Sequence, residues 1–177
     1  MTNLKFYYVD NHYIQYLQNY EINHRGFTRV PNMDYQDHNQ KFVVGKVYNI
    51  NGFNYYAPIT HYKQPKPNNL LIVINKDTHN KIKGSIRFNY MFPIPSNSLL
   101  LVDFNNILDA KQKRLLQKEY QFCIRNSNII NNLALNTYNQ VVTNCNKDMI
   151  KNYCDFTLLE KACKVYDPTL INTPTFN

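Results

Sequence analysis

Residues 42–59 have the sequence FVVGKVYNINGFNYYAPI. Two runs of β-branched and aromatic residues, Phe42–Ile50 and Phe53–Ile59, lie on either side of Asn51-Gly52. Such residues favour strands, because their side chains pack well on a pleated surface. Asn-Gly favours a type I′ turn, because both central residues of that turn need positive φ. The segment therefore predicts a β-hairpin.

Further strands are predicted on both sides of this hairpin. Thr60–Asn69 interrupts the strand pattern with two prolines, and apolar runs follow it. The predicted strands are Leu4–Val9, Leu70–Asn75, Ile82–Phe92 and a shorter one over Leu99–Phe104.

A short helix and a long loop are predicted between the first strand and the hairpin. Asp10 or Asn11 can cap the helix, one face of which carries Tyr13, Ile14, Leu17 and Tyr20. Glu21–Gln40 is polar and has no clear period, so we expect a loop there. Long loops in compact domains are often functional.

The C-terminal part of the chain changes to a helical period. Asp109 followed by Gln112 forms a capping box and predicts a helix from Ala110 onward. Its inward stripe is Leu116, Tyr120, Cys123, Ser127, Ile130 and Ala134. Asn126–Asn132 is weak in helix formers, which is compatible with a break.

A last helix is predicted near the C-terminus. Thr157 with Glu160 forms a second capping box, and Asp167-Pro168 ends the helix. Together these elements predict an α+β fold, an antiparallel sheet core with helices packed on it. The length of 177 residues suits one domain, which we expect over residues 1–168, followed by a frayed tail over 169–177.

Composition narrows the function. The formal net charge is +8, and the chain has 15 Tyr and 10 Phe. This composition only weakly favours a protein with phosphate-rich partners such as nucleic acid over a basic protein without them. No apolar run is long enough to span a bilayer, and residues 1–8 lack a signal core, so we expect a cytoplasmic protein without a membrane partner. Only 4 Gly argue against a Gly-rich phosphate loop.

Cysteine and histidine do not form a metal motif. Cys123, Cys145, Cys154 and Cys163 include no C-x-x-C pair and have no histidine near them. Structural zinc needs closely spaced ligand pairs, and acidic residues are sparse. We expect no metal and no cofactor, and we expect reduced, buried thiols.

The segment from Thr60 to Pro67 gathers the groups best suited to phosphate chemistry. Thr60 offers a hydroxyl, His61 titrates near neutrality, and Lys63 and Lys66 carry point charges. Cleaving RNA without a metal needs a group that orients the 2′-OH, a proton donor for the leaving oxygen and a cation for the phosphoryl oxygens. The segment can supply all three, but an ordinary polar loop has a similar composition.

A cationic ridge is predicted on the helix that starts at Ala110. It consists of Lys111, Arg114, Lys118 and Arg125, whose spacings of three, four and seven place them on one face. A solvated helix face and an RNA-binding surface are both consistent with this ridge.

Short blocks spread over most of the chain resemble the ToxN/AbiQ family of endoribonuclease toxins from type III toxin–antitoxin and phage abortive-infection systems. The blocks are Leu4–Tyr7, Tyr13–Leu17, Tyr35-Gln36, Lys41–Gly45, Tyr55–Thr60 with Lys63, Phe92–Pro95, Arg114–Leu116, Gln121-Phe122, Arg125–Ser127 and Cys154–Glu160. Each block is unspecific alone, and their shared order and spacing carry the resemblance.

The resemblance implies a fold and an activity. The fold is a strongly twisted antiparallel sheet flanked by helices, akin to the MazF/Kid toxins. The activity is metal-independent cleavage of A-rich RNA, including target mRNA, which leaves a 2′,3′-cyclic phosphate. A repeat pseudoknot RNA antitoxin, processed by the toxin itself, inhibits the enzyme in protein–RNA assemblies that are closed through the RNA.

The resemblance also implies site residues. The family's loop typically has Thr-Ser-x-Lys, and this chain has Thr60-His61-Tyr62-Lys63, so His61 departs from the pattern. His61 either takes part in proton transfer, leaves the hydroxyl role to Thr60, or only shapes the loop. Tyr35 matches a proton donor or RNA stacker, or else only anchors the long loop. Lys41 matches a phosphate contact, or else is an ordinary charged residue at a strand start. Tyr13 is either an RNA contact or a core residue.

Three other classes are weighed against this interpretation. A non-catalytic RNA-binding protein would use the same basic and aromatic surface for phosphate contact and base stacking. A DNA-binding regulator is weaker, because no helix-turn-helix pattern is evident. A structural protein with incidental charge would bind nucleic acid without the usual salt dependence.

Overall fold

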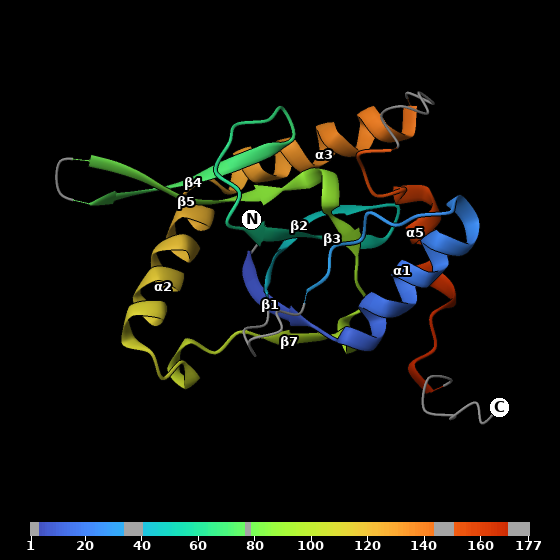
Figure 1. Cartoon of the computed structure of the whole chain (residues 1–177), viewed down its shortest axis with the longest axis horizontal. Helices are drawn as coiled ribbons and strands as arrows, with labels where there is room; N and C mark the ends of the chain where they lie inside the picture. Colours follow the sequence, from blue (N-terminus) through green and yellow to red (C-terminus); the bar gives the residue numbers. More distant parts are fainter. Residues whose placement is uncertain (1–3, 34–40, 77–78, 144–150, 170–177) are drawn as a thin grey trace.

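The computed structural model describes residues 4–33, 41–76, 79–143 and 151–169. A seven-stranded antiparallel sheet forms its centre, with the order β4-β5-β3-β2-β1-β7 and with β6 paired to β3 (Figure 1). The strands are β1 (Lys5–Val9), β2 (Val43–Ile50), β3 (Phe53–Thr60), β4 (Asn69–Lys76), β5 (His79–Arg87), β6 (Phe92–Pro93) and β7 (Leu99–Leu101). The described helices are α1 (Asn11–Arg25), α2 (Ala110–Arg125), α3 (Ser127–Thr143) and α5 (Phe156–Val165). The predicted α+β class is therefore confirmed.

The predicted hairpin is confirmed. Asn51 and Gly52 have φ values of 52° and 84°, the left-handed region that a type I′ turn needs. Ile50 pairs with Phe53 across the turn, and the register shifts between Gly45 and Tyr48 at a bulge. This hairpin is the middle of the sheet, with β1 on one side and β5 on the other.

Two predicted strands are shorter than expected. β5 ends at Arg87, because its partner β4 begins there at Asn69, and a 3₁₀ turn over Phe88–Tyr90 separates it from β6. Pairing of β7 with β1 ends at Leu101. A 3₁₀ turn over Phe104–Asn106, capped by the Asp103 carboxylate, then replaces the expected strand end.

The predicted loop over Glu21–Gln40 is wrong in its first turn. α1 continues to Arg25 and ends at Gly26, which has φ 78°. Glu21 lies in the helix, fully buried, and its carboxylate accepts hydrogen bonds from Arg25, Thr28 Oγ1 and three backbone amides, including that of Asp155 just before α5. A charged residue thus holds the chain that follows the helix. Residues 34–40 lie outside the described residues.

The C-terminal helices follow the prediction with one correction. Asp109 caps α2 by accepting from Lys111 N and Gln112 N, and α2 and α3 are separated at Asn126. The cap of α5, however, is Asp155, which accepts from Leu158 N at 3.0 Å, so Thr157 is not the cap. The carboxylate of Glu160 instead accepts from the hydroxyls of Tyr55 and Tyr138.

The helices are distributed around the sheet. α1 and α5 lie side by side at one end of the molecule, α3 packs on β2, and α2 packs on β4 near the other end (Figure 1). The inward stripe of α2 and α3 is buried at Leu116, Cys123, Ile130 and Ala134 and half-buried at Tyr120 and Ser127. Cys123 and Cys154 are buried and Cys163 is half-buried, all as free thiols, whereas Cys145 lies outside the described residues. No helix in the described part of the chain is long and apolar enough to cross a membrane.

Candidate functional site

The loop that follows β3 carries three of the predicted site residues. Thr60 is the last residue of β3 and pairs with Ser85 of β5. Its Oγ1 accepts from Tyr62 N at 3.4 Å, which turns the chain immediately after the strand. His61, Lys63 and Lys66 are exposed on this loop. Their side chains are therefore accessible to a polymer that lies along the end of β3.

Two buried polar side chains fix the path of this loop. The hydroxyl of Ser85, on β5, donates to the carbonyl of Tyr62 at 2.8 Å. Asn69, at the start of β4, bridges the far side of the loop: its Oδ1 accepts from Lys66 N at 2.9 Å and its Nδ2 donates to the Gln64 carbonyl at 3.0 Å. The backbone around His61 and Lys63 is thus bonded to the strands at both ends.

Arg87 anchors the same loop through its guanidinium. This group lies 4.5 Å from the ring centroid of Tyr62 and 4.8 Å from that of Tyr90, and its Nε donates to Asn89 Oδ1 at 3.4 Å. Arginine between two aromatic rings is held by cation–π attraction as well as by packing. The ring of Tyr62, between His61 and Lys63, therefore has a defined place.

Lys41 lies beside the end of β3. Val43 pairs with Pro58, and Ile59 N donates to Phe42 O at 3.3 Å, so the same register sets Lys41 opposite Thr60. Its ammonium donates to the carbonyl of Asn32 at 2.8 Å. Partial burial lowers the pKa of Lys41 from its usual value.

The other two predicted tyrosines are not part of this cluster. Tyr35 lies outside the described residues. Tyr13 is fully buried, donates to the carbonyl of Pro93 at 2.8 Å, and has a pKa raised well above its usual value by burial. A side chain with no exposed surface cannot touch RNA, so Tyr13 takes the core role of the two roles left open for it.

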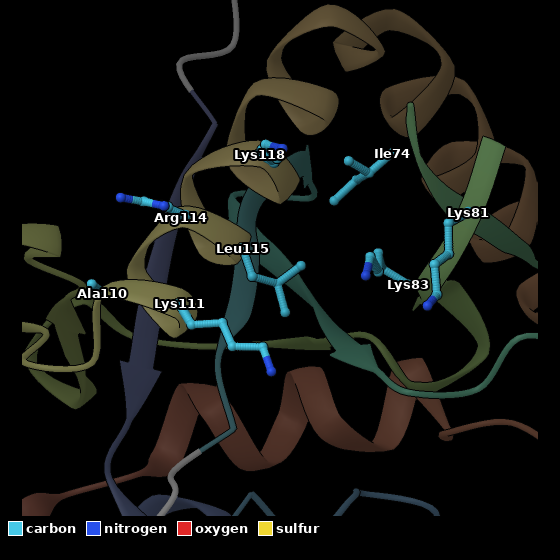
Figure 2. Close-up of a pocket in the computed structure, with 8 residues that line it drawn as sticks. All are labelled: Ile74, Lys81, Lys83, Ala110, Lys111, Arg114, Leu115 and Lys118. Carbon is cyan, nitrogen blue, oxygen red and sulfur yellow. The ribbon is translucent and has the colours of Figure 1, made fainter. Parts of the chain in front are cut away.

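The cationic ridge borders a groove between α2 and the β4–β5 hairpin. A hollow of about 490 Å³ is lined by Lys111, Arg114 and Lys118 from α2 and by two lysines of β5, Lys81 and Lys83. Figure 2 shows Lys111 and Leu115 extending from the helix toward these strand residues, with Ile74 on the opposite wall. A second hollow of about 370 Å³, which shares Ile74 and Lys118, continues to Arg125.

A carboxylate lies beside this groove. Glu119 of α2 is 6% exposed, and burial raises its pKa to about 7, an effect that the charge of Lys83 opposes. The first hollow of the groove is lined by cations and apolar side chains. Within the described ranges, no three His, Cys, Asp or Glu side chains gather closely enough to hold a metal ion.

Comparison with known proteins identifies the family. The sequence profile described as "Toxin ToxN, type III toxin-antitoxin system" matches residues 5–164. The chain therefore belongs to the ToxN family. Among curated relatives, the endoribonuclease ToxN of Pectobacterium atrosepticum is 29% identical over 89% of this chain and 91% of its own length. The endoribonuclease AbiQ of Lactococcus lactis subsp. lactis is 25% identical over 92% of this chain and 89% of its own length.

Solved structures of the ToxN family have the same fold. A type III toxin that a non-coding RNA pseudoknot selectively inhibits superposes with a TM-score of 0.77, at 25% identity, over 92% of this chain and 96% of its own. AbiQ, a lactococcal anti-phage endoribonuclease, superposes with a TM-score of 0.73, at 25% identity, over 92% of this chain and 97% of its own.

In this ToxN-family chain, Thr60 ends β3 and the loop after it carries His61, Lys63 and Lys66. Lys41 adjoins this loop, and the cationic ridge belongs to a separate surface. Sequence reasoning missed the residues that hold the loop in place, Asn69, Ser85 and Arg87, because buried polar anchors have no local pattern. It also missed Lys81 and Lys83. Their spacing of two on a strand places both on one face, which is a signal that could have found them.

Proposed function

We propose that the protein is a metal-independent endoribonuclease, the toxin of a type III toxin–antitoxin system that acts in phage defence in the cytoplasm. The observation that supports it best is the anchored loop at the end of β3. It presents a hydroxyl, an imidazole and an ammonium group from Thr60, His61 and Lys63 in a chain whose curated relatives are endoribonucleases.

The proposed reaction cleaves A-rich RNA. The 2′-OH of the nucleotide before the cut attacks the adjacent phosphorus, the bond to the 5′-oxygen breaks, and a 2′,3′-cyclic phosphate forms. Lys63 stabilises the charge on the phosphoryl oxygens, and Thr60 positions the phosphate. His61 or Tyr35 transfers a proton, and Lys41 and Lys66 contact flanking phosphates.

The proposed partners are two RNAs. Target mRNA is the substrate, and a repeat pseudoknot RNA is both processed and bound as the antitoxin, in assemblies closed through the RNA. The ridge Lys111, Arg114, Lys118 and Arg125, with Lys81 and Lys83 on the facing wall, is proposed to hold the antitoxin RNA. A likeness of the fold to the MazF/Kid toxins is also proposed, on the basis of the family resemblance.

Substrate chemistry provides the test of this mechanism. Purified protein is incubated in EDTA with an A-rich RNA and with the same oligonucleotide carrying a single 2′-deoxyribose at the cleaved nucleotide. We expect the first to be cut and the second to survive, because the nucleophile is missing. Cutting of the deoxy substrate would overturn the mechanism, and binding without any cutting would favour the non-catalytic RNA-binding protein.

Variants test the site assignment. Lys63→Ala should lower the rate about 100- to 1,000-fold, as loss of one group that stabilises transition-state charge does, and Thr60→Ala should also lower it. Lys161→Ala on α5, an exposed lysine away from the loop, is the matched control and should cut normally. If both loop variants cleave RNA and arrest growth as well as the parent, the site lies elsewhere.

A further inference from the structure

The end of the sheet that carries the candidate active site also carries the start of α1. Pairing of β1 with β2 ends at Tyr7 and Val43, and Lys41 N then donates to the carbonyl of Met33 at 2.9 Å, so the segment that ends at Met33 lies beside Lys41. α1 begins two residues after Val9, at Asn11. Because β1 and β3 both pair antiparallel with β2, the start of α1 lies at the same end of the sheet as the loop.

A small pocket lies on this part of α1. It has a volume of about 250 Å³ and is lined by Asn11, Ile14, Gln15, Gln18 and Asn32. Four of these five side chains are carboxamides, and the fifth, Ile14, is 3% exposed. Among the described residues, no charged side chain lines the pocket. The pocket is thus polar but neutral. The groove on α2, in contrast, is cationic and suits phosphate.

The pocket is connected to the candidate active site through Asn32. The backbone carbonyl of Asn32 accepts the hydrogen bond from the Lys41 ammonium at 2.8 Å. Gln18 is also fixed, because its Nε2 donates to the Val30 carbonyl at 3.2 Å. These bonds set the segment 30–32 against α1 on one side and against the proposed phosphate-binding lysine on the other.

We propose that this carboxamide pocket binds the base of an adenosine next to the cleaved bond. The proposal deepens the proposed function and rests on it, because it names the residues that select the base. A carboxamide offers a donor and an acceptor in one plane, and Asn and Gln pair bidentately with the amino group and ring nitrogen of adenine. Single-stranded RNA presents these edges freely.

Size and charge favour a single base as the occupant. Pockets for drug-sized ligands are about 300–1,000 Å³, so this one suits a smaller planar group. A phosphate would be drawn to Lys41, Lys63 or the groove, where ammonium and guanidinium groups are available. In the pocket, the amides of the carboxamide side chains bind the edge of the base.

The test combines a base analogue with a variant. In A-rich oligonucleotides, each adenosine that flanks the cut is replaced in turn by purine riboside, which lacks the amino group. We expect the parent to lose about tenfold in kcat/KM at one flanking position, within the range for a bidentate base contact. With adenosine at that position, Gln15→Ala should lower kcat/KM by about the same factor. With purine riboside there, Gln15→Ala should cause no further loss, because the variant and the analogue remove the same contact in a double-mutant cycle. Gln117→Ala, an exposed glutamine on α2, is the matched control.

The outcomes separate this inference from the function that it rests on. If the parent cuts RNA but tolerates purine riboside at every flanking position, or if the variant and analogue effects multiply independently, the pocket does not bind the base. If the parent cuts no RNA at all, the proposed function fails, and the base-binding role fails with it.

Discussion

Gly84 of β5 lies directly against the carbonyl oxygen of Thr60. A Cβ at position 84 would lie 2.3 Å from that oxygen and 3.7 Å from the Cα of His61. Real Cβ atoms do not approach other atoms this closely, and the obstacle is backbone, which cannot rotate away. The absence of a side chain at position 84 therefore permits the backbone position from which Thr60 and His61 project.

Replacing this glycine tests whether the position of the loop matters for catalysis. Gly84→Ala must push Thr60 or β5 aside, and a displacement of about 1 Å at a reacting group can cost about 100-fold in rate. We expect kcat to fall by that order in an RNA cleavage assay while circular dichroism still shows a folded protein.

The matched control is Gly26→Ala. Gly26 has φ 78°, and none of the described residues lies within 4 Å of its missing Cβ. Alanine there strains the backbone by about 1–2 kcal/mol without touching the loop. It should lower the melting temperature and leave the rate unchanged. If the two variants differ in stability alone, the close approach of Gly84 has no catalytic meaning.

Arg87 offers a second way to loosen the loop. Arg87→Gln removes two cation–π contacts, each worth about 0.5–1 kcal/mol when exposed, from the rings of Tyr62 and Tyr90. Because Arg87 acts through Tyr62 and does not reach the cleaved bond in this proposal, kcat should fall more than KM rises. Arg87→Lys should restore part of the rate, since an ammonium also attracts the rings.

Arg29→Gln is the matched control for Arg87. The Arg29 guanidinium lies 5.6 Å from the ring centroid of Phe27 and its Nε donates to the carbonyl of Lys151, so these contacts lie outside the loop that follows β3. Its replacement should leave kcat and KM unchanged. Equal effects of the Arg87 and Arg29 variants on rate would show that the loss reflects general stability.

The parts of the fold that follow local rules are predictable from the sequence. Asn51-Gly52 forms the turn because positive φ is cheap there, and Asp109 caps α2 because its carboxylate reaches two free amides. Both features depend on residues within a few positions of each other. The candidate site residues Thr60, His61 and Lys63 depend on a local signal of the same kind, since they lie at a strand end and directly after it.

Features that depend on distant partners are not predictable in this way. Glu21 is a charged residue in a polar stretch, and its burial is favourable because the amide of Asp155, far along the chain, donates to its carboxylate together with the Arg25 and Thr28 side chains and two nearby backbone amides. Asp155 and not Thr157 caps α5, a choice between two nearby candidates that local propensity does not separate. The pairing of Lys81 and Lys83 with the α2 ridge likewise arises from the packing of α2 on β4.

Salt dependence tests the RNA-binding role of the ridge. Lys118 belongs to both hollows of the groove, so Lys118→Ala should weaken binding of the antitoxin RNA. The negative slope of log K against log salt should become less steep by about 0.7 for each single-strand phosphate that the variant no longer neutralises. Lys164→Ala, exposed on α5, should leave the slope unchanged. An unchanged slope in Lys118→Ala would leave the ridge as a solvated helix face.

Glu119 gives the protein a specific pH dependence of stability. Burial raises the pKa of Glu119 to about 7 from 4.5, so the folded state binds this proton more tightly than the unfolded state does. Its stabilising contribution is complete below about pH 4.5 and is lost as the pH rises through 7. The titratable groups around it are Lys83 on β5, whose charge opposes the effect of burial, and the Cys123 thiol one turn along α2, whose own pKa is raised by burial and by Glu119.

Glu119→Gln should therefore remove this dependence. At pH 8.5 the variant should be more stable than the parent by about 1–3 kcal/mol, because a pKa that differs by one between the folded and unfolded states corresponds to about 1.4 kcal/mol. The difference should close near pH 5. Denaturant titrations at a series of pH values measure both free energies of unfolding.

The control for Glu119 is Asp167→Asn. Hydrogen bonds from Thr169 lower the pKa of this exposed carboxylate, so its replacement cannot give an excess of stability at high pH. A Glu119→Gln variant that tracks the parent at every pH would contradict the prediction. It would mean that Glu119 ionises in the folded protein as easily as in the unfolded chain, with Lys83 fully compensating its burial.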